Sequence, residues 1–336
     1  MNAPRVRFRG VAGYLPETVV GNDYFAAAAA EGEEEEVFFK GVRERRWSTD
    51  GESTVDMGTK AGQKLLEQED VDPREIDLVM TSALVNDLVL PHAACGIQHG
   101  VRATRATAIT LDTACASFVS GLIYGAALIK SGFFRKILLI VVSNFAGRAQ
   151  GRLRDRSAAI PGDGSAALLI ERRDDDGEDG LLGWWERSYG QYHGMFAVQA
   201  LTRDGDRRAF WEPHDRLAFS FDPGLVEAIK KNARELIPTA LERAMENAGT
   251  SVKDLRLVLT HQPNRYLLDY WREAVGAGPG QVHDTLEQYG NLFQASIPIT
   301  LADALDHNRV GCGDSIAMAS FALAGELVSA AVVQWN

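Results

Sequence analysis

The sequence predicts an α/β protein made of two similar halves, residues 1–172 and residues 173–336, each with a mostly parallel sheet and crossover helices. Apolar segments with strand character alternate with helical segments along the chain, which is typical of parallel sheets. In addition, KLLEQEDVDPREIDLVMTS at 64–82 aligns without gaps with RAMENAGTSVKDLRLVLTH at 243–261. Such self-similarity indicates a duplicated unit.

The composition is that of an ordinary globular protein, with 46% hydrophobic and 24% charged residues in a chain of 336. A net charge of −11 argues against general affinity for nucleic acid or an anionic membrane surface. No apolar run is long enough to span a membrane, and the N-terminus has no signal-peptide core. Three cysteines without metal-type spacing predict neither a disulfide framework nor a metal site. We therefore expect a reduced, cytoplasmic protein that binds no nucleic acid, no membrane and no metal.

The first third of the chain contains the patterns of two strands and two helices. Apolar and β-branched residues predict strands at 5–13 and 76–81. Amphipathic spacing predicts a helix over 55–69, and Pro91 is well placed to open another that continues to about residue 99. The acidic run within 22–38 is typical of a solvated face, so we give it no functional weight.

The stretch 106–131 is the one around which the rest of the chain is arranged. Alternating apolar residues predict a strand over 106–111, and a long apolar run predicts a helix that starts just after Cys115 and is buried on all sides. At the start of such a helix, free backbone N–H groups and the helix dipole favour thiolate over thiol. Cys115 is therefore the candidate nucleophile. The alternative is a small buried apolar residue, the commonest role of a free cysteine.

Two more strands and two loops are expected before residue 222. The segment 137–143 is too apolar to be anything but a central strand. A turn at 161–164 leads into a strand over 165–170. Residues 146–158 form a basic loop. Residues 171–222, acidic at first and then rich in aromatics, are expected to be irregular and to form a cap or substrate-facing loops.

The second half repeats the elements of the first. A strand over 255–260 ends at His261, helices follow from about residue 265 and after Asn291, and a further strand covers 314–321. Ligand sites gather at the carboxyl ends of parallel strands, which makes His261 a candidate site residue. The alternative is a solvent-exposed turn histidine. Because equivalent turns of a duplicated fold face each other, Cys115 and Asn291 are expected to line one site.

Three motifs resemble those of a known family: DTACASFVSGL around Cys115, HQPN at 261–264 and YGNLFQASIP at 289–298. They are similar to the nucleophile, histidine and asparagine motifs of the β-ketoacyl-acyl-carrier-protein synthase III family, in the thiolase superfamily. The resemblance covers nearly the whole chain and includes VRFRGVAGYLPETVVGND, KGVRERRW and PGDGSAALLI. It implies a thiolase-like fold with five αβαβα layers, and an acyltransferase of the ketosynthase type in a specialised fatty acid or polyketide pathway.

The resemblance also implies a catalytic site formed by Cys115, His261 and Asn291. Cys115 would take an acyl group from a thioester and form a covalent acyl-enzyme. His261 and Asn291 would donate hydrogen bonds to a malonyl-type thioester, which loses its carboxylate to give the attacking enolate. A second oxyanion hole would use the backbone N–H of Cys115 and, by alignment, that of Ala324. No cofactor is implied, because the acyl groups arrive as thioesters of a carrier protein or coenzyme A.

The sequence departs from the family pattern at the entrance and in the C-terminal segment. Residues 322–325 stand in place of a glycine-rich run, and Pro263 stands where a small residue is usual. Glu35 and Phe39 fall where typical members have the tryptophan and arginine that hold the coenzyme A nucleotide, which favours a carrier protein as donor. Leu90 matches a residue that reaches the partner subunit's acyl pocket, which implies a homodimer.

An acidic acyl carrier protein would need cations on its docking face. The candidates lie in the basic loop and on the second half, and the alternative for each is ordinary solvated surface. They are Arg148, Arg152, Arg154, Arg156, Lys230, Lys231 and Arg265.

Two other functions stay open at this point. An acyltransferase on the same scaffold would pass the acyl group from Cys115 to an amine or a hydroxyl, although Asn291 favours condensation. A non-catalytic partner subunit of another synthase is the second alternative, against which the retained Cys115 argues.

Overall fold

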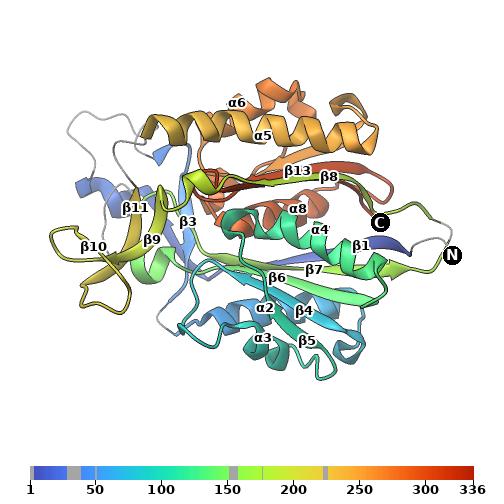
Figure 1. The fold of residues 1–336 in the computed structure, drawn as a ribbon, viewed down its shortest axis with the longest axis horizontal. Coiled ribbons are helices and arrows are strands. Elements are labelled where there is room, and N and C mark those ends of the chain that lie inside the picture. The colour runs from blue at the N-terminus through green and yellow to red at the C-terminus, as the bar shows by residue number, and fades with distance from the viewer. Residues whose placement is uncertain (1–3, 29–38, 50, 151–157, 176, 222–225) are drawn as a thin grey trace.

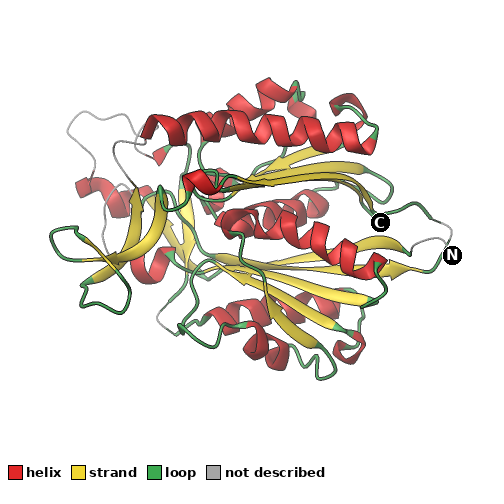
Figure 2. Cartoon of the chain, viewed as in Figure 1, coloured by secondary structure: helices red, strands yellow, loops and turns green. Residues whose placement is uncertain are grey.

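Two β-sheets, each with helices on both faces, form the body of the structure, a computed structural model (Figures 1 and 2). It describes residues 4–28, 39–49, 51–150, 158–175, 177–221 and 226–336. From one side of the molecule to the other, the layers are helix, sheet, helix, sheet and helix. The predicted α/β class and its five layers are therefore confirmed.

The first sheet contains five strands, and only some of them run parallel, as the sequence predicted for most of the sheet. In order, the strands are β1 (Arg5–Tyr14), β7 (Gly164–Arg173), β6 (Lys136–Ser143), β4 (Leu78–Ala83) and β5 (Thr107–Thr110). Strands β6, β4 and β5 run parallel, whereas β1 and β7 pair antiparallel. Every residue of β6 after Lys136 is buried, which confirms the central strand predicted from its apolar run.

The second sheet repeats the order of the first. Its strands are β8 (Leu181–Ser188), β14 (Leu327–Gln334), β13 (Ser315–Phe321) and β12 (Leu257–Thr260). As in β1-β7-β6-β4, the first two pairs are antiparallel and the last is parallel. This match confirms the duplication that the internal alignment predicted. The division of the chain between residues 172 and 173 stays a prediction, and it falls just before Arg173, the last residue of β7.

The segment 171–222 is more regular than the sequence led us to expect. Strand β8 is an edge of the second sheet, so the prediction of an irregular segment is wrong there. The rest forms a separate three-stranded sheet, seen on the left of Figure 1, with the order β10 (Arg207–Arg208), β9 (Phe196–Leu201) and β11 (Arg216–Phe221). An edge strand needs few apolar residues, because much of it faces solvent, and its pattern is correspondingly weak.

Two helices fill the space between the sheets (Figure 1). They are α4 (Ser117–Lys130) and α8 (Ser296–Asp306), and the largest hydrophobic core joins them to strands of both sheets. Glycines allow the close approach: a Cβ at Gly121 would lie 2.7 Å from the Leu139 side chain. The burial predicted for α4 is confirmed except along one stripe, where Tyr124 and Ala127 are exposed. Each large apolar side chain buried here contributes roughly 1.5–3 kcal/mol to stability.

The outer layers and the connections complete the fold. Helices α2 (Thr54–Gln68) and α3 (Ala94–Gly100) cover the first sheet, and α5 (Val226–Ala248) and α6 (Arg265–Val275) cover the second. The short elements are β2 (Thr18–Gly21), β3 (Glu44–Trp47), α7 (Leu286–Tyr289), η1 (Asn22–Ala28), η2 (Pro73–Glu75), η3 (Ala114–Ala116), η4 (Ala146–Gln150), η6 (Gly190–Tyr192), η8 (Val252–Asp254), η9 (Pro279–Gln281) and η10 (Phe293–Ala295). Within the described ranges, no helix has the length and apolar character needed to cross a bilayer.

Candidate active site

Cys115 lies in the short turn η3, between the carboxyl end of β5 and the start of α4. The turn is sharply bent, because Ala114 adopts a positive φ of 46°, a conformation that residues other than glycine rarely adopt. Hydrogen bonds hold it: the Thr113 N–H donates to Ser117 Oγ at 3.1 Å, and Ser320 Oγ donates to the Cys115 carbonyl at 2.7 Å. The second bond connects the turn that holds Cys115 to β13 of the other half.

The Cys115 thiol is buried, with 6% of the residue exposed. Burial raises the pKa of Cys115 to about 12, although the backbone N–H groups of Leu323 and of Cys115 itself oppose the shift by donating to the sulfur. Burial therefore favours the thiol form of Cys115 at neutral pH, whereas the N–H groups act in the direction expected from the sequence. The loss of hydration outweighs the favourable N–H groups, because the turn is closed off from water.

Leu323 is a site residue that sequence reasoning missed. Its backbone N–H lies against the Cys115 sulfur, and its φ of 45° is positive like that of Ala114. The role predicted for Ala324, the next residue, stays a prediction; its carbonyl accepts a hydrogen bond from Asn232 Nδ2 at 3.0 Å. The sequence did contain one indication of this role. Residues 322–325 replace a glycine-rich run of the family, and such runs are typical of backbone with positive φ.

His261 follows the carboxyl end of β12 and is 4% exposed. Its backbone N–H donates to the Ala319 carbonyl at 3.0 Å, and its ring meets the ring of Phe321 edge-on at 5.9 Å. Burial lowers the pKa of His261 to about 4, and a hydrogen bond with the Phe293 backbone partly opposes this. The imidazole is thus neutral near pH 7.

The backbone of Asn291 is fixed by the turn that precedes β7. Its N–H donates to the Ile160 carbonyl at 2.9 Å, and its carbonyl accepts from the Gly162 N–H at 2.9 Å. Glycine is required at position 162, because an added Cβ would clash with the Tyr289 carbonyl. The PGDG segment of the first half thereby sets the position of Asn291 in the second half.

The side-chain amide of Asn291 has a defined orientation. Its Oδ1 accepts a hydrogen bond from the Phe293 N–H at 2.9 Å, which leaves Nδ2 free to donate. Phe293 has a positive φ of 50° and begins η10, the turn before α8. It is the counterpart of Ala114 in the turn before α4. The same backbone bend therefore occurs in both halves, once beside the thiol and once beside the amide.

Contacts connect the three predicted residues into one cluster between the halves. The turn η3, which holds Cys115, packs against η10 and against β13. Leu323 contacts the sulfur, Phe321 contacts the ring of His261, and the Phe293 backbone joins His261 to Asn291. A thiol, a neutral imidazole and a free amide N–H₂ are thus brought together in a water-poor site.

Of the residues predicted to line the entrance, those that the structure describes here contact other parts of the chain. Arg148 forms an ion pair with Asp87 and donates to the Glu52 carbonyl, so it holds two loops together. Arg152, Arg154 and Arg156 lie outside the described residues, as does Glu35. Phe39 is buried beside the guanidinium of Arg45.

Arg265 lines a surface groove of about 740 Å³. Asn264, three residues after His261 in the sequence, also lines it. It forms a bidentate ion pair with Asp284, with distances of 2.7 and 2.9 Å. The other lining residues include several cations. The groove is lined by Lys40, Ile229, Lys230, Ala233, Arg234, Asn264, Arg265, Tyr266, Leu267 and Asp269. Lys231, also predicted as a docking cation, is exposed next to the groove-lining Lys230.

Known proteins resemble this chain over most of its length. Family models for 3-oxoacyl-[acyl-carrier-protein (ACP)] synthase III match residues 109–188 and, for its C-terminal part, residues 245–335. The beta-ketoacyl-[acyl-carrier-protein] synthase III of Roseiflexus castenholzii is 30% identical over 299 residues, 88% of each chain. Its namesake from Clostridioides difficile is 28% identical over 332 residues, 97% of each chain.

A solved structure shows the same architecture. The priming beta-ketosynthase of a polyketide biosynthetic pathway superimposes with a TM-score of 0.87 at 26% identity, and the match covers 100% of this chain and 97% of that one. The thiolase-like fold predicted from the motifs is thereby confirmed.

Proposed function

Because the chain belongs to the beta-ketoacyl-[acyl-carrier-protein] synthase III family of acyltransferases, we propose that it condenses an acyl group held on Cys115 with a malonyl-type thioester. The observation that carries this proposal is the pairing of a neutral His261 with the free amide N–H₂ of Asn291, both beside a buried thiol. Two neutral donors suit an oxyanion that develops during decarboxylation, because they stabilise it without holding a charge in the resting site.

In the first step, the sulfur of Cys115 attacks the carbonyl carbon of an acyl thioester. The S–C bond to the donor breaks, and the donor leaves as a free thiol that takes the proton of Cys115. The N–H groups of Cys115 and Leu323, which already lie against the sulfur, stabilise the tetrahedral oxyanion. Since burial holds the pKa of the thiol near 12, we infer that proton loss accompanies the attack.

In the second step, the malonyl-type thioester places its carbonyl oxygen between His261 and Asn291 Nδ2. The bond from its α-carbon to the carboxylate breaks and carbon dioxide leaves, with the electron pair forming an enolate. The enolate carbon attacks the acyl carbonyl, and the sulfur of Cys115 leaves as a thiolate, which takes a proton from water to restore the thiol. The product is a β-ketoacyl thioester. Donors that bind the enolate better than the ground-state carbonyl accelerate this step.

We expect the condensation rate to stay constant as the pH is lowered from about 7.5 to about 5, and to fall only near the pKa of His261, about 4. An unburied histidine would give a midpoint near 6.5 instead. The unfolded chain takes up this proton near 6.5 and the folded chain near 4, so the folded state loses stability as the pH falls between the two values. Initial rates of carbon dioxide release test this, with circular dichroism verifying the fold at each pH. A midpoint near 6.5 would contradict the neutral-donor role.

We propose that an acyl carrier protein docks at the groove beside Arg265 and delivers both thioesters. Lys40, Lys230, Arg234 and Arg265 give the groove a cationic lining, although Asp269 is also present. Lys230 is exposed, and within the described part of the chain its ion pair is with Glu227, at 2.8 Å, on its own helix. The Arg234 guanidinium lies 5.6 Å from the ring centre of Tyr266. These two cations are accessible to an acidic partner, whereas Arg265 is engaged with Asp284.

Reversing the charge of both residues, Lys230→Glu with Arg234→Glu, is expected to lower kcat/KM for carrier-bound substrates at least about tenfold. The loss should shrink at high salt, and the rate with a small pantetheine-like thioester should change little. The matched control is Arg243→Glu, because Arg243 forms an equivalent pair with Glu246 farther along α5. Steady-state kinetics with both donor types make the comparison. Equal losses with the two donors would exclude docking at this groove.

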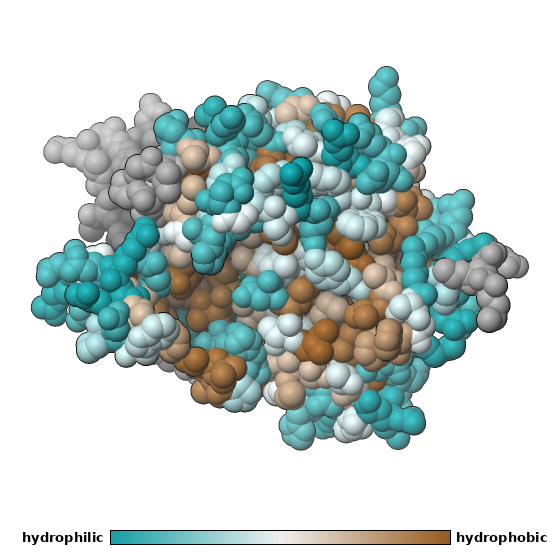
Figure 3. All heavy atoms as spheres, in the orientation of Figure 1, coloured by the Kyte–Doolittle hydropathy of each residue, from teal (hydrophilic) through white to brown (hydrophobic). Residues whose placement is uncertain are grey.

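We also propose a homodimer formed through the edge of the first sheet. Strand β5 is the outer strand, its residues are largely exposed, and the stripe of α4 with Tyr124 and Ala127 is exposed as well. Leu88, Val89 and Leu90 are 59%, 67% and 78% exposed. Figure 3 shows hydrophobic residues gathered on the face over α4 and the first sheet. An exposed apolar face beside an unpaired strand edge favours association. Sedimentation at twice the mass of one chain is the expected result.

A further inference from the structure

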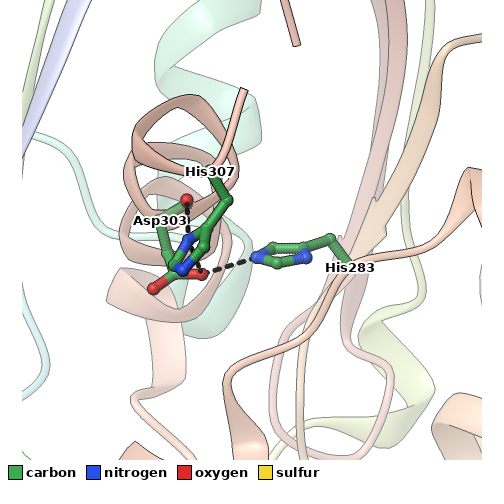
Figure 4. Close-up of side chains that lie close together, drawn as sticks. All are labelled: His283, Asp303 and His307. Carbon is green, nitrogen blue, oxygen red and sulfur yellow. Dashed lines mark hydrogen bonds and ion pairs between the residues drawn. The ribbon is translucent and has the colours of Figure 1, made fainter. Parts of the chain in front are cut away.

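A second cluster of reactive side chains lies outside the candidate active site. His283, Asp303 and His307 each offer one metal-ligating atom, and these atoms all lie within 4.8 Å of one another. Figure 4 shows the imidazoles of His283 and His307 directed toward the carboxylate of Asp303. Nothing in the condensation chemistry proposed above uses these three residues.

The distances suit a shared cation. His283 Nε2 lies 2.6 Å from Asp303 Oδ1, and His307 Nδ1 lies 3.3 Å from the same oxygen. On a tetrahedral Zn²⁺ with bonds of about 2.0–2.2 Å, neighbouring ligand atoms are about 3.3 Å apart. Small rotations of the carboxylate and of one ring therefore open the space for an ion between the three groups.

We propose that His283, Asp303 and His307 bind one divalent transition-metal ion of the Zn²⁺ type. Two imidazole nitrogens and one carboxylate oxygen form a donor set typical of Zn²⁺ and its first-row neighbours. Mg²⁺ and Ca²⁺ prefer all-oxygen sites and fit this donor set poorly. Water would complete the coordination on the open side.

The backbone positions of the three ligands are fixed by contacts that do not involve a metal. Asp303 and His307 lie one turn apart at the carboxyl end of α8. His283 is held from both sides: Val282 forms a bridge with Val258, and Asp284 pairs with Arg265. Because the three ligands are already ordered, metal binding costs less conformational entropy. The site is also accessible, because the side chain of His307 is 66% exposed while that of His283 is 15% exposed.

Binding requires both imidazoles to be neutral and displaces existing hydrogen bonds. His307 Nδ1 now donates to the Asp303 carbonyl at 2.8 Å, so its proton must move to the other ring nitrogen or to solvent. The pKa of His307 is raised by the Asp303 carbonyl and carboxylate and by Asp306. The same negative potential favours a metal cation.

A bound ion would connect α8 to the segment that leads from His283 to Asn291. In that segment the Thr285 N–H already donates to Gln262 Oε1 at 3.1 Å, and the hydroxyls of Thr285 and Thr300 share a buried hydrogen bond of 2.9 Å. The ion would add a second attachment two residues earlier. Its expected effect is on the stability of this region, so the inference does not depend on the proposed condensation activity.

The test is titration of the full-length chain with Zn²⁺ alone, after chelation and gel filtration. Cys95→Ser and Cys312→Ser are introduced first, because both thiols are exposed and could bind the ion. We expect one Zn²⁺ per chain by elemental analysis and a rise in Tm of at least about 3 °C at saturation. His283→Gln and His307→Gln should each lower the affinity at least about tenfold, and Mg²⁺ should have no effect. Substituted Co²⁺ should give the d–d bands of a nitrogen- and oxygen-ligated ion.

His193→Gln is the matched control. His193 also pairs with a carboxylate, that of Glu326 at 2.7 Å, but among the described residues it belongs to no group of three such ligands, so its removal should leave Zn²⁺ binding unchanged. His307 is exposed, so its variant is expected to fold, and the metal-free Tm verifies this. No retained Zn²⁺ in the parent chain, or equal affinity in the His283→Gln/His307→Gln double variant, would overturn the proposal.

Discussion

Replacing Cys115 with alanine is expected to abolish covalent acylation and to lower the condensation rate at least about 10⁴-fold, the scale on which enzymes lose activity with their nucleophile. The reason is that no other described thiol lies in the site: Cys95 and Cys312 are exposed on other parts of the chain. Intact-protein mass spectrometry after incubation with an acyl thioester measures the first effect, and product formation measures the second.

The matched control is Cys312→Ala, which removes an exposed thiol and should leave both the adduct and the rate unchanged. Cys115→Ala should still release carbon dioxide from a malonyl-type thioester at a measurable rate, because His261 and Asn291 remain. This retained half-reaction would show that the variant is folded. An acyl adduct that persists on Cys115→Ala would falsify the role of the nucleophile.

The fold could be predicted from the sequence because its signals are long and repeated. The buried strand β6 and the buried helix α4 have apolar runs that exclude other placements. The alignment of 64–82 with 243–261 predicted that the second sheet repeats the first, and the strand orders agree. Strand β8 was missed because an edge strand with few buried residues has no such run.

The candidate site depended on contacts that a sequence pattern does not contain. The motifs identified Cys115, His261 and Asn291 as candidates, but not the backbone that links them. Leu323 was missed because its contribution is a backbone N–H held at positive φ, and its leucine side chain gives no sign of this. The histidine and carboxylate cluster around Asp303 was missed for a related reason: His283 is twenty residues away along the chain and reaches α8 only through the fold.

The ionisation state of Cys115 shows how one physical effect outweighs another. The position of Cys115 at the start of α4 predicted a thiolate, since N–H groups there favour the anion. The structure adds burial, which raises the pKa to about 12 because the charged form loses its hydration. Position along the chain predicts the first effect, whereas only the packed structure reveals the second.

Changing Asn291 to aspartate is expected to lower condensation about 10²–10³-fold while acylation of Cys115 stays within about threefold of the parent rate. Asp and Asn have the same shape, and the retained Oδ1 can still accept the Phe293 N–H. What disappears is the Nδ2 donor. A carboxylate oxygen takes its place, and it would repel an enolate oxygen instead of stabilising it.

The two half-reactions separate this effect from a general loss of structure. Mass spectrometry of acyl-Cys115 measures the first, and carbon dioxide release from a malonyl-type thioester measures the second. Asn308→Asp makes the same change of charge at another asparagine, one that follows α8, and should leave both unchanged. If Asn291→Asp slowed acylation and decarboxylation equally, the residue would be supporting the turn rather than the reaction.

The same measurements decide between condensation and acyl transfer to an amine or hydroxyl. Transfer needs no decarboxylation, so it would leave the malonyl-type thioester intact and would not depend on a donor at Asn291 Nδ2. Condensation needs that donor, because the negative charge develops on the thioester oxygen as carbon dioxide leaves, and a neutral amide at that point lowers the barrier by about 2.7–4 kcal/mol. A chain that acylates Cys115 but never releases carbon dioxide, with or without Asn291, would therefore be a transferase that makes no carbon–carbon bond.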